Sequence, residues 1–146
     1  MLLSVILLLF QLWGNVEVSS SQNAPSGCGK PTPLEDGDIE GTVGHEYRNG
    51  AKVKYLCPNY YIMQGGPHKT CTNGQWIGQM RCLKPCTVYS QDLTTHNIGF
   101  IHSADNKMYS EHDDIIGFRC TSGRHDGALN MRQKCNDGVM LLPTCH

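Results

Sequence analysis

The sequence predicts an all-β protein built from two small disulfide-stapled modules in tandem. Eight cysteines fall into two sets of four, one within residues 28–82 and one within residues 86–146. Short runs of alternating apolar and polar residues are separated by frequent Gly and Pro. No apolar stripe with a 3.6-residue period runs long enough to predict a helix. Together these observations favour short strands that carry cysteines, arranged as beads on a string.

The N-terminal segment is set apart by an apolar run that ends at Trp13. This run is shorter than the roughly 20 apolar residues that cross a bilayer, and small residues follow it. We therefore expect residues 1–20 to be a signal peptide and residues 21–27 to be a flexible leader. The product is expected to be secreted and extracellular, with no membrane span.

Secretion decides how the cysteines are interpreted, because an oxidising compartment favours disulfides in short chains. Each module is near the size at which burial alone gives marginal stability. Closing a loop of about 40 residues contributes roughly 4 kcal/mol in the chain-entropy model. Zinc is the alternative, but the sequence has no Cys-x-x-Cys pair, and we expect neither a metal nor another cofactor. Four cysteines in each module leave three pairings open.

Charge and motifs exclude two classes of function. The chain has 12 Lys and Arg against 13 Asp and Glu, and the second module carries five basic and seven acidic residues. A nucleic-acid partner would require a basic excess on one face. The sequence contains no nucleophile elbow, HExxH motif or Gly-rich phosphate loop, so we expect no enzyme.

The first module, residues 28–82, contains one clear strand signal. Residues 51–57 alternate, so that Val53 and Tyr55 share one face while Lys52 and Lys54 point away. Further strands are expected at residues 60–63 and 68–71. An Asn73-Gly74 turn follows, and we expect Trp76 to fill the core near a disulfide.

The second module, residues 86–146, repeats this plan after a linker at residues 83–85. Strands are expected at residues 97–101, 116–120 and 129–135, with a turn at Asp137-Gly138. Three basic residues fall on outward positions of these strands, where they form either one basic strip or dispersed surface charge. They are Arg119, Arg132 and Lys134.

Five of the seven histidines also lie in the second module. We expect most of them to be exposed side chains without a special role. An alternative is that mild acidification charges them and switches on the binding of polyanions. The five are His96, His102, His112, His125 and His146.

Three stretches of the first module carry a family resemblance. Cys28-Gly-Lys-Pro at its start, Val53-Lys-Tyr-Leu-Cys57 in the middle and Cys71-Thr-Asn-Gly-Gln-Trp76 near its end resemble the complement control protein module, also called sushi. In that family the first cysteine pairs with the third and the second with the fourth. The resemblance therefore implies the disulfides Cys28–Cys71, Cys57–Cys82, Cys86–Cys135 and Cys120–Cys145. The second module is atypical because it has no Trp between its last two cysteines.

Residues 83–86 and 107–110 resemble more closely the last two modules of the complement factor H family. That resemblance implies a binding protein of the complement alternative pathway, which recognises the thioester-domain fragment of complement component three and competes with factor H. Carried over by position, Asp38 matches an acidic contact residue. Lys107 and Tyr109 match a recognition segment, and Arg132 matches an Arg before the third cysteine.

The same pair of modules in that family also recognises sialylated glycans and glycosaminoglycans. Here its Arg-Trp-Thr segment is replaced by residues 101–103, and its basic run after the second cysteine is reduced to Arg124 with His125. Because polyanion binding scales with the number of basic contacts, the complement fragment is the safer expectation.

Two other functions remain open, because a fold does not fix a function. One is an adhesion or receptor-type module pair with a protein partner outside complement. The other is a small disulfide-rich protease inhibitor, for which the sequence identifies no reactive loop.

Overall fold

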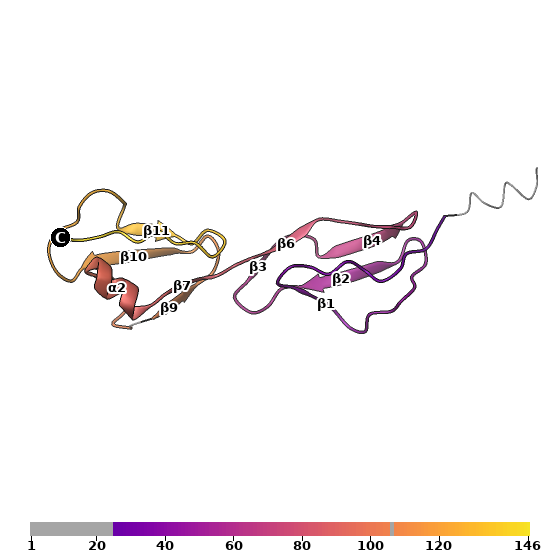
Figure 1. The fold of residues 1–146 in the computed structure, drawn as a ribbon, viewed down its shortest axis with the longest axis horizontal. Coiled ribbons are helices and arrows are strands. Elements are labelled where there is room, and N and C mark those ends of the chain that lie inside the picture. Colours follow the sequence, from indigo (N-terminus) through magenta and orange to yellow (C-terminus); the bar gives the residue numbers. More distant parts are fainter. Residues whose placement is uncertain (1–24, 106) are drawn as a thin grey trace, which may run out of the picture.

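The computed structural model describes residues 25–105 and 107–146. The expected signal peptide, and the leader up to residue 24, lie outside the described residues. The described chain forms two modules placed end to end, as Figure 1 shows. They are mostly strands with one short helix, so the prediction of an all-β chain of two stapled modules is confirmed.

The first module contains two antiparallel sheets, one of four strands in the order β1-β2-β4-β5 and one of two strands, β3 and β6. The strands are β1 (Asp38–Ile39), β2 (Lys52–Leu56), β3 (Ile62–Gly65), β4 (His68–Thr72), β5 (Gln75–Ile77) and β6 (Met80–Leu83). The alternation in β2 is as expected: Val53 and Tyr55 are buried while Lys52 and Lys54 are exposed. The expected strand at residues 60–63 begins two residues later, because Tyr60 adopts a positive φ of 70° in the preceding turn.

The core of the first module is small. Val53, Tyr55 and Met80 are its buried cluster, and Trp76 packs against them half-buried. The Tyr55 hydroxyl donates a hydrogen bond to the Thr32 carbonyl over 2.6 Å, and burial raises the pKa of this tyrosine. The Trp76 ring meets Tyr47 edge-on, with ring centroids 5.1 Å apart.

The second module has a three-stranded sheet in the order β11-β10-β8 and a two-stranded pair, β7 and β9. Its elements are β7 (Cys86–Val88), α2 (Ser90–His96), β8 (Ile98–Phe100), β9 (Met108–Ser110), β10 (Ile115–Cys120) and β11 (Arg132–Lys134). The expected strand at residues 129–135 is shorter, and β9 was not predicted.

Helix α2 shows that the expectation of no helix was wrong. Leu93 is its one buried residue, so the sequence has no apolar stripe to signal it. Its ends carry local signals instead. The Tyr89 backbone N–H donates to the Asp92 carboxylate, and Asn97 ends the helix in the left-handed conformation with φ 54°.

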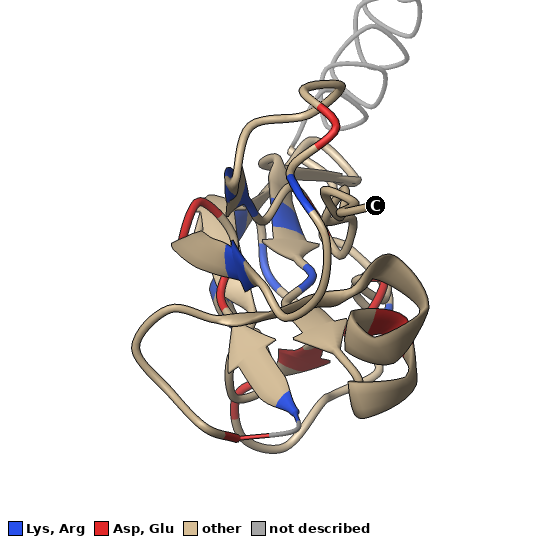
Figure 2. Cartoon of the chain, turned by 90° about the vertical axis from the view of Figure 1, so that its left-hand side faces the viewer, with Lys and Arg blue, Asp and Glu red and all other residues tan. Residues whose placement is uncertain are grey.

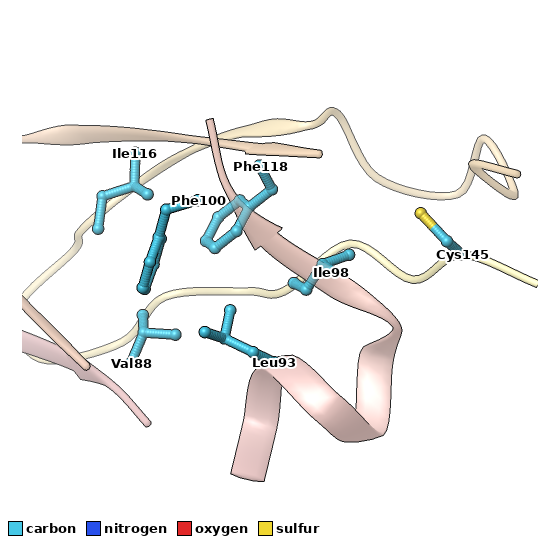
Figure 3. Packing of buried hydrophobic residues seen from close by; sticks show 7 residues of the cluster. All are labelled: Val88, Leu93, Ile98, Phe100, Ile116, Phe118 and Cys145. Carbon is cyan, nitrogen blue, oxygen red and sulfur yellow. The ribbon is translucent and has the colours of Figure 1, made fainter. Parts of the chain in front are cut away.

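The core of the second module is larger, and Leu93 docks the helix onto it (Figure 3). The rings of Phe100 and Phe118 lie 5.8 Å apart between β8 and β10. The other buried members of the cluster are Val88, Ile98, Ile116 and Cys145.

Two disulfides cross-link each module internally, in the pairs that the family resemblance implies. They are Cys28–Cys71, Cys57–Cys82, Cys86–Cys135 and Cys120–Cys145.

The junction between the modules is held by the turn that follows β11. One carboxylate oxygen of Asp137 accepts a hydrogen bond from the Lys84 backbone N–H over 2.8 Å. The other accepts from the Arg81 guanidinium over 2.7 Å. The Lys84 ammonium lies 3.7 Å from the Asp36 carboxylate. Asp137 of the second module therefore hydrogen-bonds both the last strand of the first module and the linker.

Replacing Leu93 by Ala is expected to lower the free energy of unfolding of the second module by about 2–5 kcal/mol, because it empties the site that docks α2. Denaturant unfolding of the oxidised protein, followed by second-module amide signals in NMR spectra, measures this loss. Thr95→Ala, on the exposed side of the same helix, should cost less than about 0.5 kcal/mol. Equal losses for the two variants would contradict the anchoring role of Leu93.

Candidate functional site

Four exposed side chains from both modules meet beside the junction, and we call them the tyrosine–lysine surface. They are Tyr60, Tyr89, Lys107 and Tyr109. The Lys107 ammonium lies 4.9 Å from the centre of the Tyr109 ring and 5.0 Å from that of Tyr89. Tyr60, from the first module, stacks on Tyr109 with ring centroids 6.0 Å apart and planes 19° apart. The three rings are between 51% and 60% exposed.

The strands and turns of both modules place these rings outside. Tyr109 lies between half-buried Met108 and buried Ser110 in β9, so the alternation of the strand turns it outward. Tyr89 follows β7 and precedes the first residue of α2. Tyr60 sits in the turn between β2 and β3, where the Tyr61 N–H donates to the Pro58 carbonyl.

The surroundings of Lys107 favour its charged form. The interaction with the Tyr109 side chain raises the pKa of this lysine. A cation over an aromatic face is attracted by the negative face of the ring. Lys107 takes part in none of the salt bridges found among residues 25–105 and 107–146. Its ammonium can therefore meet a carboxylate of a partner.

Asp38, the acidic contact residue expected from the sequence, lies exposed on β1. It pairs in register with Leu56, the last residue of β2, and the chain then runs into the turn that holds Tyr60. Asp38 and Tyr60 therefore lie toward the same end of the first module, the end that meets the second module in Figure 1.

Three of the expected basic residues lie on one face of the three-stranded sheet. Arg132 pairs with Gly117 and Lys134 with Ile115, so both project from the same sheet face as Arg119. All three are exposed, as expected.

Two features break this strip of basic residues. The Ile101 side chain covers the space above Gly117, and the Arg119 guanidinium lies over Gly99 on β8. Arg124 belongs to another region, because its backbone pairs with that of His146 at the end of the chain. Figure 2 shows acidic segments interspersed among the basic ones at this end of the molecule. The structure thus gathers no single basic face from Arg119, Arg124, Arg132 and Lys134.

Sequence reasoning missed Tyr60 and Tyr89. Tyr89 carried a weak signal, since it directly follows Val88 and falls on the outward side of the alternation in which Cys86 and Val88 point inward. Tyr60 carried none, because its contact with Tyr109 depends on the angle between the modules.

Of the five second-module histidines, three are exposed, as expected for most of them, whereas His96 and His112 are half-buried. Within the described ranges 25–105 and 107–146, no group of His, Cys, Asp and Glu is arranged to hold a metal ion. In the same ranges, no helix is both long and apolar enough to cross a membrane.

Comparison with known proteins identifies the family. Residues 28–82 match the family model of the sushi repeat (SCR repeat). The chain is 33% identical over 134 residues to complement factor H-related protein 2 of Homo sapiens. The aligned region covers 91% of the chain and 50% of that protein. It is 28% identical over 148 residues to complement factor H of Bos taurus, covering 93% of the chain and 12% of that protein.

A further relative has a name from blood coagulation. The B chain of coagulation factor XIII of Homo sapiens is 26% identical over 123 residues, which cover 81% of the chain and 19% of that protein. The chain spans about half the length of factor H-related protein 2 and a smaller share of the other two. The chain is therefore a sushi-repeat protein related to complement factor H and the factor H-related proteins.

Proposed function

We propose that this protein is a secreted binding protein of the complement alternative pathway that recognises fragments of complement component three on surfaces. Its relation to factor H-related protein 2 over 91% of the chain carries this proposal. The thioester-domain fragment is the ligand that the family resemblance implies for this pair of modules. Binding rather than catalysis is the chemistry that exposed aromatic and charged side chains support.

The tyrosine–lysine surface supports a protein ligand. Tyrosine is enriched at protein interfaces because it combines a large apolar ring with a polar hydroxyl. Lys107, held between Tyr89 and Tyr109, adds a charge that selects an acidic partner group. Because Tyr60 belongs to the first module, a ligand that covers this surface contacts both modules.

Competition with factor H follows from this proposal. A chain bound to the thioester-domain fragment occupies surface that factor H would otherwise contact. Surface plasmon resonance on immobilised thioester-domain fragment tests binding, and added factor H tests competition. Absence of binding at about tens of micromolar would end the proposal.

Glycan binding is the weaker part of the proposal. Arg119, Arg132 and Lys134 are the residues that would contact sialylated glycans or glycosaminoglycans, with Arg124 on the loop that pairs with the end of the chain. Their separation makes us expect weak retention on immobilised heparin, lost at moderate salt.

A second candidate is an adhesion or receptor-type module pair with a partner outside complement. The similarity to the B chain of coagulation factor XIII favours it, because that relative bears a name from clotting. A pull-down from autologous serum separates the two candidates by the identity of the captured protein.

Asp38→Ala and Tyr109→Ala are each expected to weaken binding of the thioester-domain fragment about tenfold or more, as truncation of a central interface residue does. Surface plasmon resonance measures both affinities. Glu46→Ala and Ile77→Ala are the controls: the first removes an exposed carboxylate and the second an exposed large apolar side chain, both in the first module and outside the tyrosine–lysine surface. Controls that lose as much affinity as the test variants would remove the support for this surface.

Inserting two glycines between Lys84 and Pro85 is expected to weaken binding about tenfold, because Asp38 and Tyr109 then lose their fixed relation. The same affinity measurement applies. Two glycines inserted after Gly127, whose surroundings are open, lengthen an exposed loop as a control. If the linker insertion leaves affinity unchanged, the ligand binds one module alone.

A further inference from the structure

The hydrogen bond between His112 and the junction turn fixes the protonation state of this histidine. The Asp137 backbone N–H points at His112 Nδ1 over 3.0 Å. A backbone N–H can only donate, so Nδ1 must be the unprotonated acceptor. The ring is therefore neutral, with its proton on Nε2, which lies 3.3 Å from an Asp113 carboxylate oxygen.

Protonation of His112 is incompatible with this contact. It would place a second N–H at Nδ1, facing the N–H of Asp137, and the hydrogen bond would be lost. The gain at the other ring nitrogen is small, because the Asp113 side chain is 70% exposed and its attraction is screened. The His112 side chain is only 16% exposed, so water replaces the lost partner poorly.

Asp137 transmits this change to the other module. Its backbone contacts His112 within the second module, while its carboxylate contacts the Arg81 guanidinium and the Lys84 N–H. A shift of the turn that breaks the first contact moves the carboxylate that makes the other two.

We propose that His112 and Asp137 are positioning residues that fix the angle between the modules, and that protonation of His112 releases this angle. The charged and titratable neighbours of His112 on its own turn are Asp113, 3.3 Å away, with Glu111 and Asp114. On the turn after β11 the neighbour is Asp137, through which Arg81 and Lys84 are connected to this histidine. Lys84 in turn lies 3.7 Å from Asp36.

Asp137 itself does not titrate in the range that charges a histidine. The hydrogen bond from the Lys84 N–H, with the nearby Arg81, holds the pKa of this carboxyl below its ordinary value. Its contribution is present above the ordinary carboxyl range and is lost only as the pH falls through the lowered pKa. A change between about pH 7.5 and about pH 5.5 therefore reports on histidine.

The first module contains a non-titrating version of the same contact. There the Asn73 backbone N–H donates to Asn49 Oδ1 over 2.9 Å. Asn73 starts the turn after β4 as Asp137 starts the turn after β11, and Asn49 and His112 each lie eight residues before the second cysteine of their module. Asparagine thus supplies an acceptor at this place that no proton can remove.

His112→Asn is accordingly the matched test. Residual dipolar couplings of the amides of residues 28–82 and of residues 86–145 report whether the modules share one alignment tensor. At about pH 7.5 we expect one shared tensor for the wild type, and at about pH 5.5 two separate tensors. His112→Asn should keep one shared tensor at both pH values, and Asp137→Ala should show two at both.

His102→Asn, on an exposed loop, should respond to pH as the wild type does. The couplings within each module verify that it stays folded. A wild type that keeps one tensor at both pH values overturns the proposal, as does a His112→Asn variant that responds like the wild type. We call the contacts of Asp137 with His112, Arg81 and Lys84 the polar clamp. An Asp137→Ala variant with one shared tensor contradicts the role of this clamp in fixing the angle between the modules. Should His112→Asn fail to fold, the wild-type comparison and Asp137→Ala still decide.

These measurements need no ligand, so their outcome is independent of the proposed function. Where that function holds and one ligand spans both modules, the affinity of the wild type for the thioester-domain fragment should fall at about pH 5.5 while that of His112→Asn stays constant.

Discussion

Each module has a small core and relies on its own disulfides, and this constraint is the one on which the rest of the structure depends. In the first module the fully packed cluster consists of Val53, Tyr55 and Met80, which is little apolar burial for a unit of this size. Each disulfide closes a loop of 25 to 49 residues, which is worth roughly 3–4 kcal/mol in the chain-entropy model. Because the bridges supply this stability, large apolar residues such as Tyr60 and Tyr109 can remain on the surface.

The junction joins two such units into one continuous surface. The stack of Tyr60 on Tyr109 joins residues that lie 49 positions apart in the sequence, and it exists only at one range of module angles. The contacts of Asp137 with Arg81 and Lys84 restrict that angle from the turn after β11. The polar clamp and the aromatic stack therefore depend on the same geometry, and loosening one alters the other.

The features that follow from local sequence could be predicted, and those that follow from packing between modules could not. The alternation of residues 51–57 is enough to place Val53 and Tyr55 inside, because a strand with one buried face permits only that arrangement. Helix α2 escaped prediction, because Leu93 is its one buried residue and the contacts of His96 with Thr144 and Cys145 join segments 48 or 49 positions apart. Lys107 and Tyr109 came from the family resemblance, which could not indicate Tyr60 as their neighbour.

The two modules share the turn on which the polar clamp is built. In both modules the turn after the third cysteine adopts the same conformation, with φ of 48° and 83° at Asn73 and Gly74 and of 45° and 85° at Asp137 and Gly138. In both modules the turn also holds the chain two residues before the first cysteine.

The two turns hold that incoming chain by different groups. In the first module the Gly74 N–H donates to the Ser26 carbonyl. In the second the Asp137 carboxylate accepts from the Lys84 N–H. In each module, therefore, this turn hydrogen-bonds the segment that leads into the first cysteine. An aspartate at its first position adds a charge that also reaches Arg81 of the preceding module. The two modules differ here by Asp in place of Asn in the turn and by His in place of Asn beside it. Together with Arg81 and Lys84, these two residues give the second module a charged contact, which we propose that a proton weakens.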